Sequence, residues 1–247
     1  MTIPQPPRLP RVIGHRGAMG HAPENTLAGL EKAAAMGVRW VEFDVKLTAD
    51  NQIILMHDDD LERTTDGKGR VAGTTLEEIR KLDAGRWFSA DYTGEKVPTL
   101  DEAMAALAAR GMGANVEIKP CKGREAETGA AVAGALANRW MNGPQPPFVS
   151  SFSTASLAAA RDTAPLVPRA LLTLVFLPGW AAKMEQLGCA CFNVLDRLIT
   201  ERRVQGIRQA GYRPLAFTVD NGARAANLLS WGVESVITSY PDRMPDG

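Results

Sequence analysis

Residues 40–45 read Trp-Val-Glu-Phe-Asp-Val, an apolar run that contains two acidic residues, Glu42 and Asp44. Side chains two positions apart on a strand share a face, so the two carboxylates would point to the same side and the residues between them to the other. Charged side chains are costly inside a strand unless they are paired or bind an ion. This stretch therefore predicts a buried strand whose two carboxylates, Glu42 and Asp44, belong to a functional site.

Seven similar short apolar runs lie along the chain, separated by stretches with helical spacing. The expected strands are 12–14, 40–45, 115–118, 148–152, 169–173, 191–195, 215–219 and 236–238. Helices are expected at 25–36, 100–110 and 223–231, each followed by a glycine suited to a helix C-terminus. Alternating strands and helices favour a parallel sheet, and eight such units in 247 residues predict an α/β fold, the (β/α)8 TIM barrel.

The interval between the second and third expected strands is much longer than the later ones, which indicates an insertion. A polar turn at 49–52 separates two apolar runs and predicts an antiparallel hairpin. Residues 58–98 are rich in Asp, Gly, Arg and Thr, and within them 59–65 is interpreted as loop rather than as part of a site. We expect a single TIM-barrel domain over 1–247, with a small inserted lobe at about 46–98 over the barrel mouth.

Charge and composition restrict the partners. The chain has 28 Lys+Arg and 28 Asp+Glu, so it lacks the basic excess typical of nucleic-acid or anionic-lipid binding. We expect no membrane insertion, because no window approaches the roughly 20 apolar residues of a spanning helix, and no secretory signal in residues 1–10. The cysteines are odd in number, and a bridge between Cys189 and Cys191 would be strained. A cytoplasmic location is predicted, and the oligomeric state stays open.

Carboxylates gather where the chemistry of a TIM barrel is found, at the carboxyl ends of the strands. Glu42 and Asp44 lie on the second expected strand, and Glu117 lies on the third. Three carboxylates form an oxygen-only ligand set, which suits one hard divalent cation such as Mg²⁺ or Ca²⁺. The alternative is a pair of surface strands whose charges face solvent, and the apolar residues that flank the acids argue against it.

Two of the three histidines, His15 and His57, end the first strand and the returning arm of the hairpin. Two imidazoles beside a metal can share the proton transfers of a displacement at phosphorus. Arg16 and Lys119 would bind the phosphate, the first as a fork and the second as a point charge. Each residue also has a structural alternative: a hydrogen-bonded histidine, or a cation that neutralises the neighbouring acids.

Lesser roles are expected for four other residues. Asn25 would cap the helix that begins at Thr26, and Glu24 could reach the mouth. His21 is interpreted as structural. Phe217, near the end of the seventh strand, would offer an apolar wall to a substrate or belong to the core.

The ordered motifs of the chain resemble those of the glycerophosphodiester phosphodiesterase family, in particular its short bacterial cytosolic members associated with glycerol-3-phosphate uptake. The matching pieces cover nearly the whole chain and are Gly14-His15-Arg16-Gly17, Pro23-Glu24-Asn25-Thr26, Glu42-Phe43-Asp44-Val45, Leu47-Thr48 through His57-Asp58, Leu61-Glu62-Arg63-Thr64, Val97-Pro98-Thr99-Leu100, Glu117-Ile118-Lys119, Ser151-Phe152-Ser153 and Thr218-Val219-Asp220. Two departures are Phe217, where many members have tryptophan, and Ser239, where many have aspartate.

The resemblance implies a barrel with an inserted lobe and a divalent metal held by the three carboxylates. It implies hydrolysis of small glycerophosphodiesters, such as glycerophosphocholine or glycerophosphoethanolamine, to glycerol 3-phosphate and an alcohol. In the scheme it implies, the glycerol hydroxyl of the substrate attacks phosphorus, water opens the resulting cyclic phosphate, and His15 and His57 serve as acid and base.

Two other functions compete with this one. Lys119 could form a Schiff base with a carbonyl substrate, as in a barrel aldolase, but this leaves the three carboxylates without a role. The barrel could also bind metal and phosphate without turnover, although the chain retains both candidate proton carriers.

Overall fold

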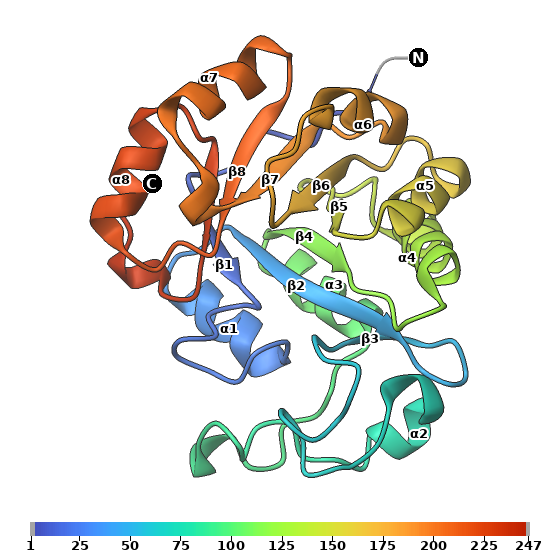
Figure 1. Cartoon of the computed structure of the whole chain (residues 1–247). Coiled ribbons are helices and arrows are strands. Elements are labelled where there is room, and N and C mark those ends of the chain that lie inside the picture. Colours follow the sequence, from blue (N-terminus) through green and yellow to red (C-terminus); the bar gives the residue numbers. More distant parts are fainter. Residues whose placement is uncertain (1–2, 246–247) are drawn as a thin grey trace.

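Parallel strands close into a barrel in the computed structural model, which describes residues 3–245 (Figure 1). The eight barrel strands are β1 (Val12–His15), β2 (Trp40–Leu47), β4 (Gly113–Ile118), β5 (Phe148–Ser151), β6 (Arg169–Thr173), β7 (Cys191–Leu195), β8 (Arg213–Phe217) and β9 (Ser235–Thr238). Each pairs in parallel with its neighbours, and the pairing of β1 with both β2 and β9 closes the ring. The predicted (β/α)8 barrel is therefore confirmed.

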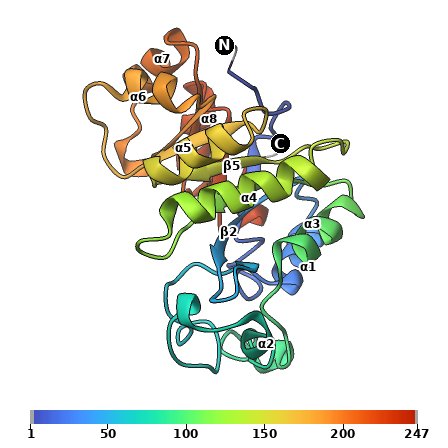
Figure 2. The same cartoon turned by 90° about the vertical axis from the view of Figure 1, so that its right-hand side faces the viewer.

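Helices connect the strands and cover the outside of the barrel (Figure 1). They are α1 (Leu27–Ala35), α3 (Leu100–Ala108), α4 (Glu125–Arg139), α5 (Thr154–Thr163), α6 (Trp180–Leu187), α7 (Glu201–Gln209) and α8 (Gly222–Ser230). Figure 2 shows α4 and α5 side by side along one flank. The last strand, β9, is followed by a short 3-10 turn, Pro241–Arg243.

Several sequence-based boundaries differ from the structure by one or two residues, and two of these differences have a clear physical reason. The seventh barrel strand runs over 213–217 rather than 215–219, because Arg213 and Pro214 already pair with β7. The first helix is capped by Thr26, whose hydroxyl accepts a hydrogen bond from the backbone N–H of Gly29 at 3.0 Å, and not by Asn25. The side chain of Asn25 is used in the site described below.

Apolar side chains fill the space between the strands and the helices. One buried cluster joins β2 and β4 to α1, α3 and α4, and a second joins β6, β7 and β8 to α6, α7 and α8. Burial of this kind is the main stabilising term in a domain of this size. This packing holds the strands in register, and the register determines which side chains lie at the strand ends.

The insertion begins with the expected hairpin. Beyond the barrel, β2 pairs antiparallel with β3 (Ile53–Leu55), and residues 56–98 follow with the short helix α2 (Leu76–Ile79). This segment packs around a small apolar cluster of its own. The two ends of this segment lie side by side, since the backbone N–H of Leu55 donates to the carbonyl of Pro98 at 2.9 Å. Figures 1 and 2 show it projecting from the side of the barrel that carries β2 and β3.

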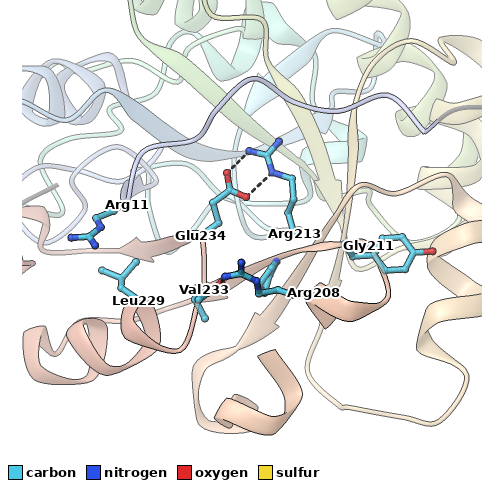
Figure 3. A pocket seen from close by; sticks show the side chains of 10 residues that line it. Arg11, Arg208, Gly211, Arg213, Leu229, Val233 and Glu234 are labelled. Atoms are coloured by element: carbon cyan, nitrogen blue, oxygen red, sulfur yellow. Dashed lines mark hydrogen bonds and ion pairs between the residues drawn. The ribbon is translucent and has the colours of Figure 1, made fainter. Parts of the chain in front are cut away.

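The amino ends of the barrel strands carry a hollow lined by arginine side chains. This hollow measures about 500 Å³ and is lined by Arg11, Arg208 and Arg213 among others (Figure 3). Arg213 is ion-paired with Glu234 and donates to the carbonyls of Pro6 and Pro7. These contacts hold the N-terminal segment against the barrel, so we interpret Arg213 here as structural.

Candidate active site

Three carboxylates meet at the carboxyl ends of β2 and β4. The strand register places Asp44 beside Glu117, and Glu42 beside His15 of β1. Oxygen atoms of Glu42, Asp44 and Glu117 all lie within 4.8 Å of one another, and the residues are only 2%, 1% and 7% exposed. The structure therefore brings together the three residues expected to hold a metal.

The electrostatics of this cluster fit a cation. Burial raises the pKa of Glu117 to about 7, with Asp44 adding to the effect, and burial together with Asp44 and Glu117 raises the pKa of Glu42. Oε1 of Glu42 is buried and has no hydrogen-bond partner. A divalent cation would give that oxygen a partner and neutralise the mutual repulsion. The donor set and its unpartnered oxygen thus suit a hard metal ion.

Asp44 is held as an anion by its neighbours. Burial alone would raise its pKa, but Arg16 and Lys119 lower it below the ordinary value. Nε of Arg16 lies 3.0 Å from Asp44 Oδ2, and Nζ of Lys119 lies 3.8 Å from Asp44 Oδ1 and 3.2 Å from Glu117. The two residues expected to bind phosphate are therefore both beside the carboxylates.

The turn after β1 is fixed by backbone contacts. Arg16 has a left-handed backbone with φ 49°, and its N–H donates to Glu42 Oε2 at 3.1 Å. Gly17 follows with φ 86°, and a Cβ there would lie 2.5 Å from the backbone of Gly29 in α1. Because the turn is packed this closely, Arg16 is aimed at the carboxylates rather than at solvent.

Asn25 does not cap a helix but supports Asp44. Its backbone is also left-handed, with φ 56°, and its amide donates to Asp44 Oδ2 at 2.9 Å. Its own oxygen accepts from the backbone N–H of Asp44 at 3.1 Å. The sequence pattern favoured a cap because Asn is common there, and nothing local revealed the long-range contact.

The two candidate proton carriers lie on the same rim. Nε2 of His15 is 3.8 Å from Glu42, and its Nδ1 is 3.5 Å from the hydroxyl of Ser239. Nδ1 of His57 is 2.6 Å from Asp58, so that carboxylate orients the ring and leaves Nε2 available. Burial, with a contribution from Arg16, lowers the pKa of His15 to about 4, and burial also lowers the pKa of His57.

Arg63 was missed by the sequence interpretation of 59–65 as loop. Its guanidinium donates to both oxygens of Glu24 at 2.8 Å and to Asp58 at 2.6 Å. Glu24 is 4% exposed and also accepts from Arg16 at 2.7 Å. Through Glu24, Arg63 therefore ties the inserted segment to Arg16, and it also holds Asp58, the partner of His57. Its motif formed part of the family resemblance, which was the only signal for it.

Lys46 makes a second link of this kind. Its side chain is 1% exposed, and Nζ donates to Asp59 at 2.6 Å and to the carbonyl of Lys119 at 2.9 Å. The inserted segment is thus anchored to the backbone that carries Lys119.

Phe217 lies at the mouth and is half-buried. Its ring packs edge-to-face on Phe152, with centroids 5.6 Å apart, and Nζ of Lys119 lies 5.5 Å from the Phe152 ring centroid. His21, expected to be structural, is paired with Asp242 at 2.7 Å. The structure thus separates the third histidine from the other two.

With this geometry in place, comparison with known proteins identifies the family. Residues 15–243 match the model of the glycerophosphoryl diester phosphodiesterase family, and the chain belongs to that family. The enzyme class expected from the motifs, a phosphodiesterase that hydrolyses glycerophosphodiesters to glycerol 3-phosphate and an alcohol, is confirmed. The competing aldolase and non-catalytic functions find no support there.

Individual relatives match this chain over nearly its full length. A solved phosphodiesterase of Oleispira antarctica, in complex with the product sn-glycerol 3-phosphate, is 40% identical, with a TM-score of 0.92 over 96% of this chain and 95% of its own. YhdW of Bacillus subtilis is 36% identical over 238 residues, which cover 94% of this chain and 95% of the relative. A glycerophosphodiester phosphodiesterase of Caldanaerobacter subterraneus is 33% identical over 94% of this chain and 95% of its own length.

Among residues 3–245, no helix is both long and apolar enough to cross a bilayer.

Proposed function

We propose that this protein hydrolyses glycerophosphodiesters with one divalent cation, Mg²⁺ or Ca²⁺, held by Glu42, Asp44 and Glu117. The observation that carries the proposal is the convergence of these three buried carboxylates beside two histidines and two cationic side chains. When bound, the cation supplies Lewis-acid stabilisation of charge on the phosphoryl oxygens.

The substrate phosphate would be bound by Arg16 and Lys119. In the structure both cations contact the carboxylate cluster, Arg16 at Asp44 and Lys119 at Glu117. A guanidinium can give two parallel hydrogen bonds to a phosphoryl group, whereas an ammonium acts as a point charge. The product named in the Oleispira antarctica complex, sn-glycerol 3-phosphate, supports a site for a small phosphate ester.

The two histidines would move the protons of the reaction. His57, with Nδ1 bound to Asp58, can accept or give a proton at Nε2, and His15 can do the same from the carboxyl end of β1. Lowered pKa values keep both rings neutral near pH 7, and a neutral ring can start as a base. One histidine would take the proton of the attacking hydroxyl, and the other, after taking up a proton from solvent, would protonate the leaving oxygen.

The inserted lobe would form one side of the site within a single domain. Arg63 and Lys46 support this, since they join residues of the insertion to Glu24 and to the backbone of Lys119. We also propose a cytoplasmic location, which is supported by three cysteines that are free and buried.

The test is release of glycerol 3-phosphate from glycerophosphocholine by the purified protein, with and without EDTA. We expect chelation to abolish release and added Mg²⁺ or Ca²⁺ to restore it. Turnover that is indifferent to chelation would overturn the metal assignment but keep the activity. No release with either metal would overturn the proposed substrate.

A further inference from the structure

Three polar side chains inside the barrel have no hydrogen-bond partner among the described residues. They are those of Asn115 on β4, Ser150 on β5 and Asn193 on β7, and all three residues are fully buried. In each asparagine both the amide nitrogen and the amide oxygen are unpartnered, so exchanging the two atoms would satisfy neither. Buried polar groups are almost always hydrogen-bonded, so these atoms indicate a bound group that partners them.

The strand register turns all three side chains toward the barrel axis. Asn115 lies two residues before Glu117 on β4, so it shares the face that carries this carboxylate. Ser150 pairs with Glu117 across β4 and β5 and therefore points the same way. The pairings of β6 with its two neighbours continue this face to Asn193 of β7. The three unpartnered side chains thus face one another inside the barrel.

Two of these side chains lie level with a proposed metal ligand. Inward side chains of an eight-stranded barrel form layers of four, contributed by alternate strands, because neighbouring strands are staggered by about one residue. With this stagger, the pairings of the present barrel place at one level Glu42, Ser150, Asn193 and Ile237. Asn115 pairs with Glu42 and falls in the next layer toward the amino ends. The unpartnered groups therefore lie beside Glu42 or just below it.

The neighbouring side chains leave room at this level and close it from below. Bulky branched residues usually fill the interior of such a barrel, but Ser150 and Ala170 are small, and both are fully buried. Toward the amino ends the interior is apolar, since Trp40 and Phe148 pack with ring centroids 5.9 Å apart in a buried apolar cluster. A group bound here is confined between this apolar floor and the carboxylate of Glu42.

The chemistry of the unpartnered atoms favours water over an ion. Each asparagine offers two N–H donors and a carbonyl acceptor, and the serine hydroxyl both donates and accepts. A cation would meet the amide donors, and an anion would be repelled by Glu42. Water donates and accepts equally well, and buried water typically makes about three hydrogen bonds to groups of this kind. Water is therefore the ligand that suits all of these atoms.

We propose that these three side chains bind ordered water inside the barrel, and that this water positions the carboxylate of Glu42. Oε2 of Glu42 accepts from the backbone N–H of Arg16 at 3.1 Å, while Oε1 has no partner in the described part of the chain. A carboxylate oxygen has two lone pairs, so Oε1 can accept from a water on the axis and still face a cation. The positioning role rests on the proposed metal site, whereas the water site does not.

A high-resolution crystal structure of the wild-type protein, grown in EDTA, tests the water site. We expect water density about 2.7–3.2 Å from both asparagine side chains and from the hydroxyl of Ser150. Direct hydrogen bonds among the three side chains, with no water between them, would overturn the proposal. An ion identified there by anomalous scattering would overturn it as well.

Calorimetric titration with Mg²⁺ and with Ca²⁺ tests the positioning role. Ser150→Ala removes one hydroxyl at nearly constant volume, and we expect about tenfold weaker affinity, as for other groups that support a metal ligand. Asn193→Ala should weaken binding at least as much, and Asn193→Ser, which keeps a hydroxyl, should restore part of the affinity. The matched control is Ser235→Ala, because that buried hydroxyl donates to the carbonyl of Pro10 at the amino end of β9. It should lower Tm but leave the metal affinity unchanged.

Two results would overturn the positioning role. One is unchanged metal affinity in both alanine variants, and the other is an equal loss in Ser235→Ala, since the effect would then follow stability. Should Asn193→Ala fail to fold, Ser150→Ala and Asn193→Ser decide the question between them. Failure of the wild type to bind either cation would overturn the proposed metal site instead, and the crystal structure would still test the water site separately.

Discussion

The two halves of the barrel mouth differ in chemistry. The half formed by β1, β2 and β4 carries His15, Glu42, Asp44 and Glu117, and these groups lie beside Arg16, Lys119 and residues of the inserted segment, while Oε1 of Glu42 has no partner among the described residues. The half formed by β5, β6 and β8 ends in Phe152, Phe217 and the exposed loop after β6.

The difference shows that a single barrel can place the charged groups proposed for the reaction on one set of strands and the apolar groups that could contact a substrate on another. Charged groups need partners that hold them in place, and the first half supplies these through strand register and through Arg63 and Lys46. Apolar contacts are less directional, so the second half can be more open. Substitutions in the first half should change the rate for every substrate, and substitutions in the second half should change which substrate is preferred.

The largest effect is expected for Glu42→Gln in the charged half. Losing one negative ligand should lower kcat/KM by about 10³-fold, because several kcal/mol of charge stabilisation depend on the bound cation. Calorimetric titration with Mg²⁺ or Ca²⁺ should show weakened binding in the same variant. Unchanged metal affinity and activity would remove Glu42 from the ligand set.

A somewhat smaller loss is expected for His15→Ala and for His57→Ala. General acid–base catalysis contributes about 10²-fold or more, so kcat should fall by that amount while KM changes less. His21→Ala is the matched control, since this histidine is paired with Asp242 away from the carboxylates. A variant whose kcat stays within a few-fold of the wild type would take that histidine out of the proton transfers.

The link between the insertion and the charged half should be visible as stability. Asp59→Ala leaves the buried ammonium of Lys46 with only the carbonyl of Lys119, and we expect a loss of about 2 kcal/mol in urea unfolding. Asp60→Ala is the control, because Asp60 is exposed and lies 3.8 Å from an exposed Arg70, and it should change stability by no more than about 0.5 kcal/mol. Equal effects of the two variants would contradict the link.

The smallest effect is expected from the thiols of β7 and the residues before it. Burial raises the pKa of Cys189 and of Cys191 to about 12, so both stay neutral thiols at every pH below that value. Because the thiolate is the reactive form, the folded protein should not react at these positions with a thiol reagent at pH 8. Labelling should appear on denaturation, and fast labelling of either cysteine in the folded state would contradict the burial.

The sequence predicted the fold because the barrel repeats one local pattern. Runs such as 40–45 and 169–173 are short, apolar and regularly spaced, and each became a strand. The cluster of three carboxylates was also predictable, since i and i+2 residues on one strand share a face and the carboxyl ends of barrel strands meet at one rim.

The contacts that cross between distant segments were not predictable in this way. Asn25 bonds Asp44, Arg63 reaches Glu24, and Ser239 stands beside His15. Each pairing depends on how a loop folds over the barrel, and no local periodicity encodes that. The same holds for the loop after β6, where the outward position of Val175 follows from the inward anchoring of Phe176.

The hydrogen bond between Leu55 and Pro98 has a consequence for how such proteins diverge. The chain leaves the barrel and re-enters it at one point, so the part of the segment beyond Arg63 can change in length or sequence without shifting β2 against β4. Closing a longer loop adds little entropy cost, since each doubling costs only about 0.6 kcal/mol. Evolution can vary the outer part of this segment as long as His57, Asp58 and Arg63 are kept, and an engineer could graft a different outer part between Arg63 and Pro98.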